Sequence, residues 1–178
     1  MIETERLILR HWRDEDAETL YKYASDPEVG HPAGWPPHTS VENSLEVIRT
    51  VFNAPEVYAV VLKSTREPIG CCGIMFSESL HSADMRPTEG EIGYWIAKPY
   101  WGLGLIPEAV RALLHRGFDD LDISTMWCGY YDGNDKSKRV CEKCGFRFHH
   151  TNLDVVSPLG DKRTEHIYVM TKDDFSSF

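Results

Sequence analysis

Hydrophobic and polar residues follow one another along this chain with two different periods, and together they predict a mixture of strands and helices. Short runs of β-branched and aromatic residues indicate strands, whereas apolar residues spaced three or four positions apart indicate amphipathic helices. The strands are expected at residues 6–10, 57–63, 68–77, 91–96, 124–131, 146–152 and 166–170. The helices are expected at residues 14–25, from a cap at Thr39 or Ser40 to residue 52, from Pro107 to Leu114, and at 134–144.

Proline, glycine and polar residues mark the connections between these elements. Residues 30–38 are dense in glycine and proline and contain Trp35, so they are expected to form a loop after Pro27 ends the first helix. Residues 64–67 are expected to turn a hairpin, and the polar residues 78–90 to form a longer loop. Hairpins combined with one strand–helix–strand crossover predict an α/β (α+β) fold, in which one mixed sheet carries helices on its faces.

The composition is that of one ordinary globular domain, which we expect to span residues 1–178. Apolar residues make up 42% of the chain, which is enough for a substantial core. No run approaches about eighteen apolar residues, so no membrane span is predicted, and the charged residues 1–6 predict a cytoplasmic protein. The net charge of −9 argues against broad nucleic-acid binding and is compatible with a cationic amine as partner.

The five cysteines are odd in number and fit a reduced protein better than a disulfide framework. Cys141 and Cys144 form a C-x-x-C motif with two histidines close behind at 149–150, so a zinc site is one interpretation. The favoured interpretation is packing without metal, because residues three apart share a helix face and buried cysteine behaves as a small hydrophobe. Cys71 and Cys72 lie within a predicted strand, and a covalent mechanism would require a histidine beside one of them.

The stretch of residues 91–114 begins as a strand, breaks at a glycine turn and continues as a helix. Gly102 and Gly104 lie two apart, and Pro107 suits the first helical turn because its missing N–H would have no partner there. Free N–H groups and the helix dipole favour an anion at such a place, and glycine lets a phosphate approach the backbone. The turn is neither a dinucleotide fingerprint, whose third glycine position is Pro107 here, nor a Walker A loop, which requires G-K-[ST].

A second polar motif opens the helix predicted at 134–144. Asn134 is a candidate N-cap, and Ser137 follows it in the first turn. Gly145 ends the helix as a C-terminal cap does, and Phe146 comes directly after it. Taken alone, these residues indicate a capped helix.

The turn and the second motif carry a resemblance to a known family. Tyr-Trp-Gly-Leu-Gly-Leu-Ile-Pro-Glu-Ala (100–109) resembles the pyrophosphate loop of the GNAT acyl-CoA N-acetyltransferases. Trp101 stands at the first position of that loop, Gly104 at the middle one and Ile106 at the last, where the family has a small residue. The loop is most similar to that of the RimJ/RimL-like branch, which contains the ribosomal-protein N-terminal acetyltransferases.

Two further segments extend the resemblance over nearly the whole chain. Residues 134–146 resemble the Asn-x-x-Ser helix of the same family with its closing Gly-Phe, and residues 3–10 resemble its opening strand. The similarity is weakest at 78–87 and 152–163. The resemblance implies the GNAT fold, with about seven mostly antiparallel strands, about four helices, and a splay between the fourth and fifth strands through which the cofactor enters.

The resemblance also implies an activity, the direct transfer of an acetyl group from acetyl-CoA to a primary amine. The acceptor is expected to be a protein N-terminus or a small amine, and no metal is expected. A non-catalytic GNAT-fold module that binds acyl-CoA as a sensor or scaffold is the alternative. Dimers are frequent in the family, so a homodimer is one expectation. Trp35 and Tyr94 are expected to contact the acceptor, and residues 78–87 are a second candidate wall for it.

Within this family the cofactor is expected to contact the end of the central strand, the glycine turn and the start of the helix at 134. The resemblance assigns cofactor binding to Trp95, Ile96, Trp101, Gly102, Leu103, Gly104, Leu105, Ile106, Asn134 and Ser137. The matching serine of the branch lies near the thioester sulfur, so Ser137 is a candidate general acid. Asn134 is expected to contact the cofactor or the reacting group and is counted with the catalytic residues.

The acceptor amine must lose a proton before it attacks, because a free α-amine has a pKa of about 8 and a lysine about 10.4. Glu91 stands where some GNAT enzymes carry their general base, so it is the first candidate for this role. Glu89, Tyr131 and a chain of water molecules are the alternatives. Backbone amides at the strand break beside residues 94–96 are expected to stabilise the oxyanion.

Overall fold

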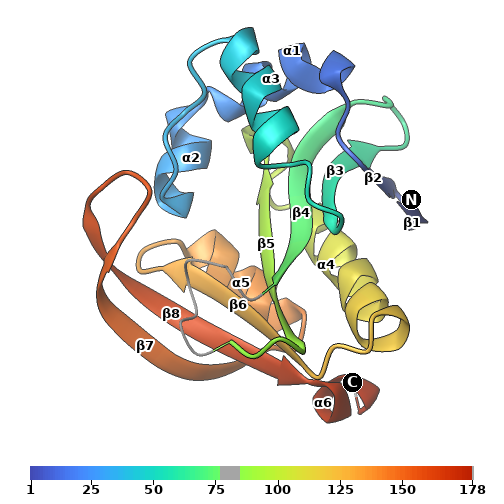
Figure 1. The fold of residues 1–178 in the computed structure, drawn as a ribbon, viewed down its shortest axis with the longest axis vertical. Coiled ribbons are helices and arrows are strands. Elements are labelled where there is room, and N and C mark those ends of the chain that lie inside the picture. The colour runs from blue at the N-terminus through green and yellow to red at the C-terminus, as the bar shows by residue number, and fades with distance from the viewer. Residues whose placement is uncertain (77–84, 178) are drawn as a thin grey trace.

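The computed structural model describes residues 1–76 and 85–177, which form one eight-stranded sheet with helices on both faces (Figure 1). The strand order is β1-β2-β3-β4-β5-β6-β8-β7, and neighbouring strands in the described residues pair antiparallel except β5 and β6, which pair parallel. The strands are β1 (Ile2–Glu3), β2 (Leu7–Arg10), β3 (Val57–Leu62), β4 (Pro68–Phe76), β5 (Glu89–Ile96), β6 (Thr125–Tyr131), β7 (Arg147–Val156) and β8 (Lys162–Thr171).

Six α-helices accompany the sheet in the described ranges, with three short helical turns between them. The α-helices are α1 (Ala17–Ala24), α2 (Pro27–Ala33), α3 (Val41–Thr50), α4 (Leu105–His115), α5 (Asp135–Lys143) and α6 (Lys172–Ser176). The short turns are η1 (Asp14–Asp16), η2 (Lys98–Tyr100) and the π-helical η3 (Arg116–Asp120). Of the helices in residues 1–76 and 85–177, none has both the length and the apolar character needed to cross a bilayer.

Alternation along the strands divides the core between the two faces of the sheet. Leu7 and Leu9 belong to the apolar cluster that includes α4 and α5, whereas Ile8 between them belongs to the cluster with α1 and α3. Leu113 and Leu114 are almost fully buried, so the apolar stripe predicted for this helix is confirmed. The sheet is therefore a central layer, and burial on both faces fixes its register.

The fold class predicted from the sequence is confirmed, and the element count differs slightly. Eight strands replace about seven because the two-residue β1 pairs with β2, and six helices replace about four. The short α6 was not predicted, and it begins at a capping box in which Thr171 and Asp174 bond reciprocally. The closing strands β7 and β8 are also longer than the expected 146–152 and 166–170.

The loop predicted at 30–38 is wrong in its first part, because Pro27–Ala33 forms α2. Asp26 caps this helix by accepting a hydrogen bond from the N–H of Glu28, and Pro27 occupies its first turn. Gly34 ends it in the left-handed region at φ 81°. Pro27 therefore begins a helix, whereas the sequence pattern predicted only that it ends the preceding one.

The loop predicted at 78–90 lies partly outside the described residues, which leave out 77–84. Glu89 and Gly90, which were expected in that loop, belong to β5. The central strand thus begins two residues before the predicted start at Glu91. Pairing with β6 explains the extension, since Glu89 and Gly90 lie opposite Thr125 and Met126.

The parallel pairing of β5 with β6 is short and leaves the two strands apart beyond it. The paired residues end at Glu91, opposite Trp127, although β5 continues to Ile96 and β6 to Tyr131. On its other edge β5 stays paired with β4 as far as Ile96. The sheet therefore opens between β5 and β6 directly after Glu91. This is the splay expected between the fourth and fifth strands, because the additional strand β1 shifts the numbering by one.

Candidate active site

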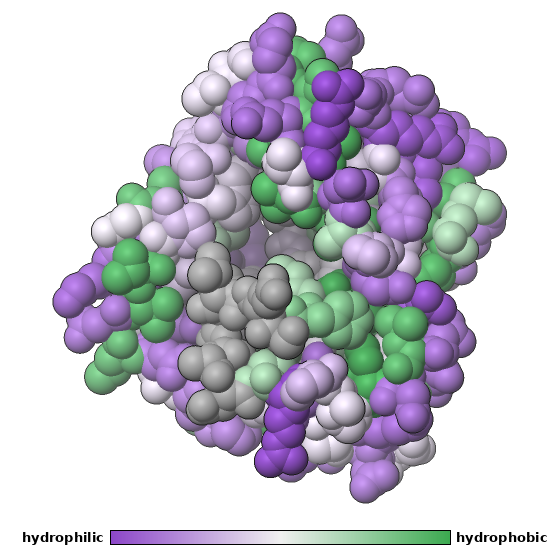
Figure 2. All heavy atoms as spheres, in the orientation of Figure 1, coloured by the Kyte–Doolittle hydropathy of each residue, from purple (hydrophilic) through white to green (hydrophobic). Residues whose placement is uncertain are grey.

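A cleft of about 1050 Å³ lies where the sheet opens, and it opens on the face shown in Figure 2. This volume is at the upper end of the range for small-molecule sites. The predicted site residues that line it are Trp35, Glu91, Tyr94, Trp95, Ile96, Trp101, Gly102, Gly104, Leu105, Ile106, Asn134 and Ser137. Residues predicted from distant parts of the chain therefore come together around one cavity.

Leu103 and Glu89 are the two predicted candidates that do not line the cleft. The Leu103 side chain is 55% exposed, and its carbonyl accepts a hydrogen bond from Arg6 at 2.9 Å. The Glu89 carboxylate accepts from the Trp127 indole at 2.9 Å and from the N–H of Arg86 at 3.1 Å. Glu89 is therefore held within the sheet, which leaves Glu91 as the better placed carboxylate.

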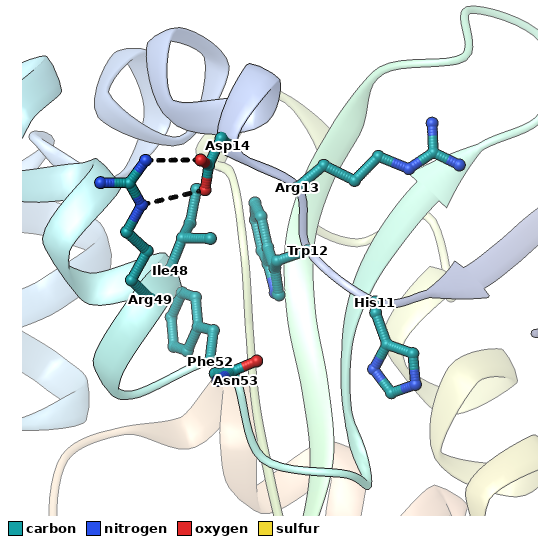
Figure 3. A pocket seen from close by; sticks show the side chains of 8 residues that line it. All are labelled: His11, Trp12, Arg13, Asp14, Ile48, Arg49, Phe52 and Asn53. Atoms are coloured by element: carbon teal, nitrogen blue, oxygen red, sulfur yellow. Dashed lines mark hydrogen bonds and ion pairs between the residues drawn. The ribbon is translucent and has the colours of Figure 1, made fainter.

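A second, much smaller pocket of about 160 Å³ lies between the end of β2 and α3 (Figure 3). Two hydrogen bonds from Arg49 to Asp14 cross its rim, at 2.6 and 3.2 Å. Trp12 and Phe52 stack beside it with ring centroids 5.2 Å apart. Its volume is below that of usual ligand sites, so the large cleft is the candidate active site.

The glycine turn at one end of the cleft presents backbone N–H groups. Gly102 and Gly104 have φ of 76° and 74°, a left-handed conformation that glycine adopts without a steric penalty. Leu105 and Ile106 are the first two residues of α4, so their N–H groups lack an intrahelical acceptor. The Ile106 side chain is 5% exposed and packs into the core, so the large residue at this position does not project from the turn.

Trp101 connects the end of β5 with the turn and with α5. Its indole N–H donates to the carbonyl of Ile96 at 2.9 Å. The ammonium of Lys136 lies 4.0 Å from the centroid of its ring, a cation–π geometry. The tryptophan predicted to open the pyrophosphate loop therefore also has a structural role.

Three basic side chains of α5 line the same end of the cleft, and the sequence analysis did not single them out. They are Lys136, Arg139 and Lys143. Their spacing of three and four residues places them on one face of a helix. That spacing was the available signal, but the overall charge of −9 hides this local basic strip.

The N-terminus of α5 is fixed by Asn134. Its side-chain oxygen accepts a hydrogen bond from the N–H of Ser137 at 3.3 Å, so the N-cap interpretation is confirmed. Its amide nitrogen donates to the carbonyl of Pro32 in α2, also at 3.3 Å. Asn134 thus links two elements that lie on opposite sides of the cleft.

Ser137 and Tyr94 form a hydroxyl pair beside the opening of the sheet. Their hydroxyl oxygens lie 2.9 Å apart, and the Tyr94 hydroxyl also donates to the carbonyl of Ser137 at 3.1 Å. Two thiols, of Cys128 and Cys141, lie 3.8 and 3.7 Å from the same hydroxyl. Burial raises the pKa of Tyr94 well above its ordinary value, so this hydroxyl keeps its proton at neutral pH.

Buried carboxylates lie at the other side of the cleft. Glu91 and Glu165 both line it and are only 4% and 2% exposed. Tyr131 also lines the cleft and lies opposite Glu165 in the pairing of β6 with β8. Burial and then the charge of Glu165 are the largest causes that raise its pKa, and the charge of Arg163 opposes them. Glu165 was missed because it comes from β8, and only the register of β8 on β6 places it opposite Tyr131.

An aromatic wall completes this side of the cleft. The Trp35 ring lies 5.8 Å from that of Trp95 and 5.9 Å from that of His38. His38 is bonded to the Ser44 hydroxyl at 2.8 Å, and burial lowers its pKa, so the imidazole is neutral at pH 7. The wall is therefore aromatic and uncharged at neutral pH.

The cysteines have the properties of core residues. All five are buried and free, including Cys141 and Cys144 of the C-x-x-C motif. Burial raises the pKa of Cys71 to about 12, and that of Cys72 lies well above its ordinary value. These thiols are therefore protonated and unsuited to act as nucleophiles. Within residues 1–76 and 85–177, no group of three or more His, Cys, Asp or Glu residues has the arrangement of a metal site.

Comparison with known proteins adds a family match to this geometry. The family model described as "Acetyltransferase (GNAT) domain" matches residues 6–147. The chain is 30% identical over 149 residues to the protein "Uncharacterized N-acetyltransferase p20" of Bacillus licheniformis, which covers 81% of this chain and 80% of that protein. The match to the family model covers the glycine turn, the opened sheet and the N-terminus of α5.

Solved structures share the whole fold at lower sequence identity. Ribosomal-protein-S5-alanine acetyltransferase from Vibrio fischeri superposes with a TM-score of 0.74 at 20% identity, covering 97% of each chain. AAC(6')-Ib in complex with ribostamycin and coenzyme A superposes with a TM-score of 0.76 at 21% identity, also covering 97% of each chain. The first neighbour is named for a ribosomal protein and the second is bound to ribostamycin and coenzyme A, so the shared fold does not select an acceptor.

Proposed function

This chain belongs to the GNAT acetyltransferase family and is an acetyl-CoA-dependent N-acetyltransferase, and we propose that its acceptor is a primary amine bound beside Glu91 and Glu165. The observation that carries the proposal is the separation of charge within one cleft. Backbone N–H groups and the basic side chains of α5 line one side, and two buried carboxylates line the other. The first side suits phosphates, and the second suits an ammonium group.

The residues on the first side fit acetyl-CoA. The N–H groups of residues 104–106 face a pyrophosphate at the start of α4, and the three basic residues of α5 neutralise phosphate charge. The unpaired edge of β5 beyond Glu91 offers backbone groups to the amides of the pantetheine arm, as an added strand would use them. When bound, the thioester supplies the activated acetyl group.

The residues near the point where β5 and β6 separate have different roles in the reaction. Glu91 accepts the proton of the ammonium, directly or through water, and the freed amine attacks the thioester carbonyl. Backbone N–H groups beside residues 94–96 stabilise the developing charge on the carbonyl oxygen. Ser137 donates a proton to the departing sulfur and regains one from the amine nitrogen, which loses its second proton as the tetrahedral intermediate collapses. Tyr94 orients the Ser137 hydroxyl and keeps its own proton.

We place the chain in the RimJ/RimL-like branch because residues 100–109 and the Asn134–Ser137 motif match that branch together. On this assignment the acceptor is a peptide N-terminus or a small amine of similar reach. The activity resides in one domain spanning residues 1–178. A homodimer stays a prediction.

An acceptor screen tests the proposal. Release of the CoA thiol from acetyl-CoA is followed with a panel of peptides with free N-termini and of small mono- and diamines. The same peptides with acetylated N-termini and no lysine serve as matched controls. We expect thiol release only with free amines. Tight acetyl-CoA binding without thiol release for any amine would favour the sensor or scaffold alternative instead.

A further inference from the structure

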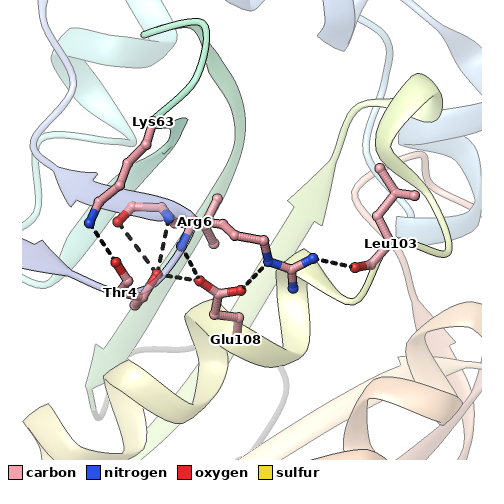
Figure 4. Close-up of polar contacts among 6 residues, drawn as sticks. Thr4, Arg6, Lys63, Leu103 and Glu108 are labelled. Atoms are coloured by element: carbon pink, nitrogen blue, oxygen red, sulfur yellow. Dashed lines mark hydrogen bonds and ion pairs between the residues drawn. The ribbon is translucent and has the colours of Figure 1, made fainter.

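The glycine turn is held from behind by an ion pair that joins it to the N-terminal strands (Figure 4). The guanidinium of Arg6 donates to the Glu108 carboxylate at 2.7 Å and to the Leu103 carbonyl at 2.9 Å. The other oxygen of Glu108 accepts from the N–H of Arg6 at 2.8 Å and from the hydroxyl of Thr4 at 2.5 Å. One arginine therefore joins the chain before β2, the turn and the first turn of α4.

The bond to Leu103 fixes the orientation of the peptide unit between Leu103 and Gly104. The peptide group is planar and trans, so its C=O and N–H point in opposite directions. Arg6 holds the carbonyl on the outer side of the turn, and the N–H of Gly104 then points the opposite way, toward the cleft that Gly104 lines. No acceptor among residues 1–76 and 85–177 takes this N–H, so it is available to an anion.

This orientation needs a restraint because the turn contains two glycines. Gly102 and Gly104 flank Leu103 with positive φ, and glycine adopts many other conformations at little energetic penalty. A turn that samples several peptide orientations binds its ligand more weakly, in proportion to the fraction of time spent in the competent one. The planar fork of arginine suits the restraint, because it bonds Glu108 and Leu103 at once.

We propose that Arg6, oriented by Glu108, is a positioning residue for acetyl-CoA, which holds the turn with the N–H of Gly104 directed at the pyrophosphate. The inference rests on the proposed placement of the pyrophosphate at this turn. Arg6 itself lies behind the turn and acts through it. The ion pair is partly exposed, at 43% and 15% of the two side chains, and such pairs contribute little to overall stability.

The experiment compares Arg6→Ala with Arg116→Ala as a matched control. Arg116 also bonds a glutamate, Glu56, through two nitrogens at 2.9 and 3.2 Å, and its exposure of 32% is similar, but it lies beyond the other end of α4. Affinity for CoA is measured by calorimetry, and kinetics are measured with acetyl-CoA and with S-acetylpantetheine, which lacks the pyrophosphate. Thermal melting is recorded for each variant.

We expect Arg6→Ala to weaken CoA binding and raise KM for acetyl-CoA by about tenfold, which corresponds to a turn that is competent about a tenth of the time. The kcat value and the kinetics with S-acetylpantetheine should change less than about twofold. Arg116→Ala should leave CoA affinity at the wild-type level. Arg6→Lys, which keeps the charge without the planar fork, should stay close to Arg6→Ala.

Three results would overturn the inference while leaving the proposed function in place. They are an unchanged CoA affinity in Arg6→Ala, an equal loss with S-acetylpantetheine, and full recovery in Arg6→Lys. An equal loss of CoA affinity in Arg116→Ala would also overturn it, because the effect would then follow from general stability. A folded wild-type protein that binds no CoA would overturn the proposed function together with the inference.

Discussion

The two sides of the cleft are built in different ways. The cofactor wall, which comprises residues 94–106 and α5, is formed by two short segments and offers mainly backbone N–H groups, with basic side chains behind them. The acceptor wall, which comprises α2, residues 34–38, Glu91 and Glu165, offers side chains that come from three separate parts of the chain. Many sequences can offer backbone N–H groups, whereas a side chain depends on the residue at its position. We therefore propose that the cofactor wall carries the chemistry common to the family and that the acceptor wall carries specificity.

The two walls are joined directly at one end of the cleft. Asn134 of the cofactor wall donates to the carbonyl of Pro32 in the acceptor wall at 3.3 Å. Arg163 of β8 donates to the carbonyl of the neighbouring His31 at 2.6 Å. Substitutions elsewhere in either wall should still have separable effects, because neither contact involves Glu91, Tyr94 or Ser137.

The largest effect is expected for Glu91→Gln, which removes the proposed base, the acceptor-wall carboxylate at the point where β5 and β6 separate. General acid–base catalysis is typically worth about 10² to 10⁴ in rate, so kcat should fall by at least about 10² while CoA affinity is unchanged. Glu89→Gln is the matched control, since Glu89 lies two residues away on the same strand but outside the cleft. Steady-state kinetics would contradict the assignment if Glu89→Gln lost more activity than Glu91→Gln.

Gly104→Val should weaken the cofactor wall alone. A left-handed backbone costs a residue with a side chain roughly 1–2 kcal/mol, and a β-branched residue more, so CoA affinity should fall by at least about tenfold. Gly160→Val is the control, because Gly160 has a similar φ of 84° but lies in the β7–β8 turn, where no described atom comes within 4 Å of an added side-chain carbon. At Gly104 that carbon would lie 3.7 Å from the Arg6 guanidinium, which is an ordinary contact. Calorimetry with both proteins folded should find the loss in Gly104→Val only; the same loss in both would mean that backbone strain acts through general stability.

Ser137→Ala should lower kcat by about tenfold with little change in KM for acetyl-CoA, because a proton to the departing sulfur matters mainly in the transition state. Tyr94→Phe should have a smaller effect, since Tyr94 acts through the serine hydroxyl 2.9 Å away. The double variant should be no slower than Ser137→Ala. Additive losses would instead indicate that the two hydroxyls act independently.

The smallest effect is expected at the acceptor wall, for Trp35→Ala. The ring contacts with Trp95 and His38 position an apolar surface, and an aromatic pair is worth about 0.5–1.5 kcal/mol beyond its burial. KM for the acceptor should rise about two- to tenfold, while CoA affinity stays constant. Trp101→Ala should instead weaken CoA binding and leave KM for the acceptor unchanged. Equal changes for both ligands in both variants would contradict the division into two walls.

The cofactor wall could be predicted from the sequence because its interactions are local. Asn134 bonds the N–H of Ser137 three residues away, and Gly104 adopts its left-handed conformation directly before α4. The spacing of residues along the sequence is therefore enough to predict these local features. The helix α2 itself was not predicted, since Pro27 is compatible with the end of one helix and with the start of the next.

Glu165 of the acceptor wall, the contact between Tyr94 and Ser137, and the restraint behind the turn could not be predicted in this way. Glu165 reaches the cleft only through the pairing of β8 with β6, and the Tyr94–Ser137 contact spans 43 residues. Arg6 bonds Leu103 across 97 residues. Strand register and helix packing decide these contacts, and no short pattern in the sequence encodes them.

The central claim is that acetyl-CoA binds the cofactor wall with its sulfur at Ser137, and that the acceptor amine approaches from the carboxylate side. A crystal structure of the protein with CoA tests it most directly. The account predicts the pyrophosphate on the N–H groups of residues 104–106, and the sulfur within about 4 Å of the Ser137 hydroxyl, near the contact distance of reacting groups. A pyrophosphate bound along the acceptor wall, or a sulfur that faces away from both Ser137 and Glu91, would contradict the account.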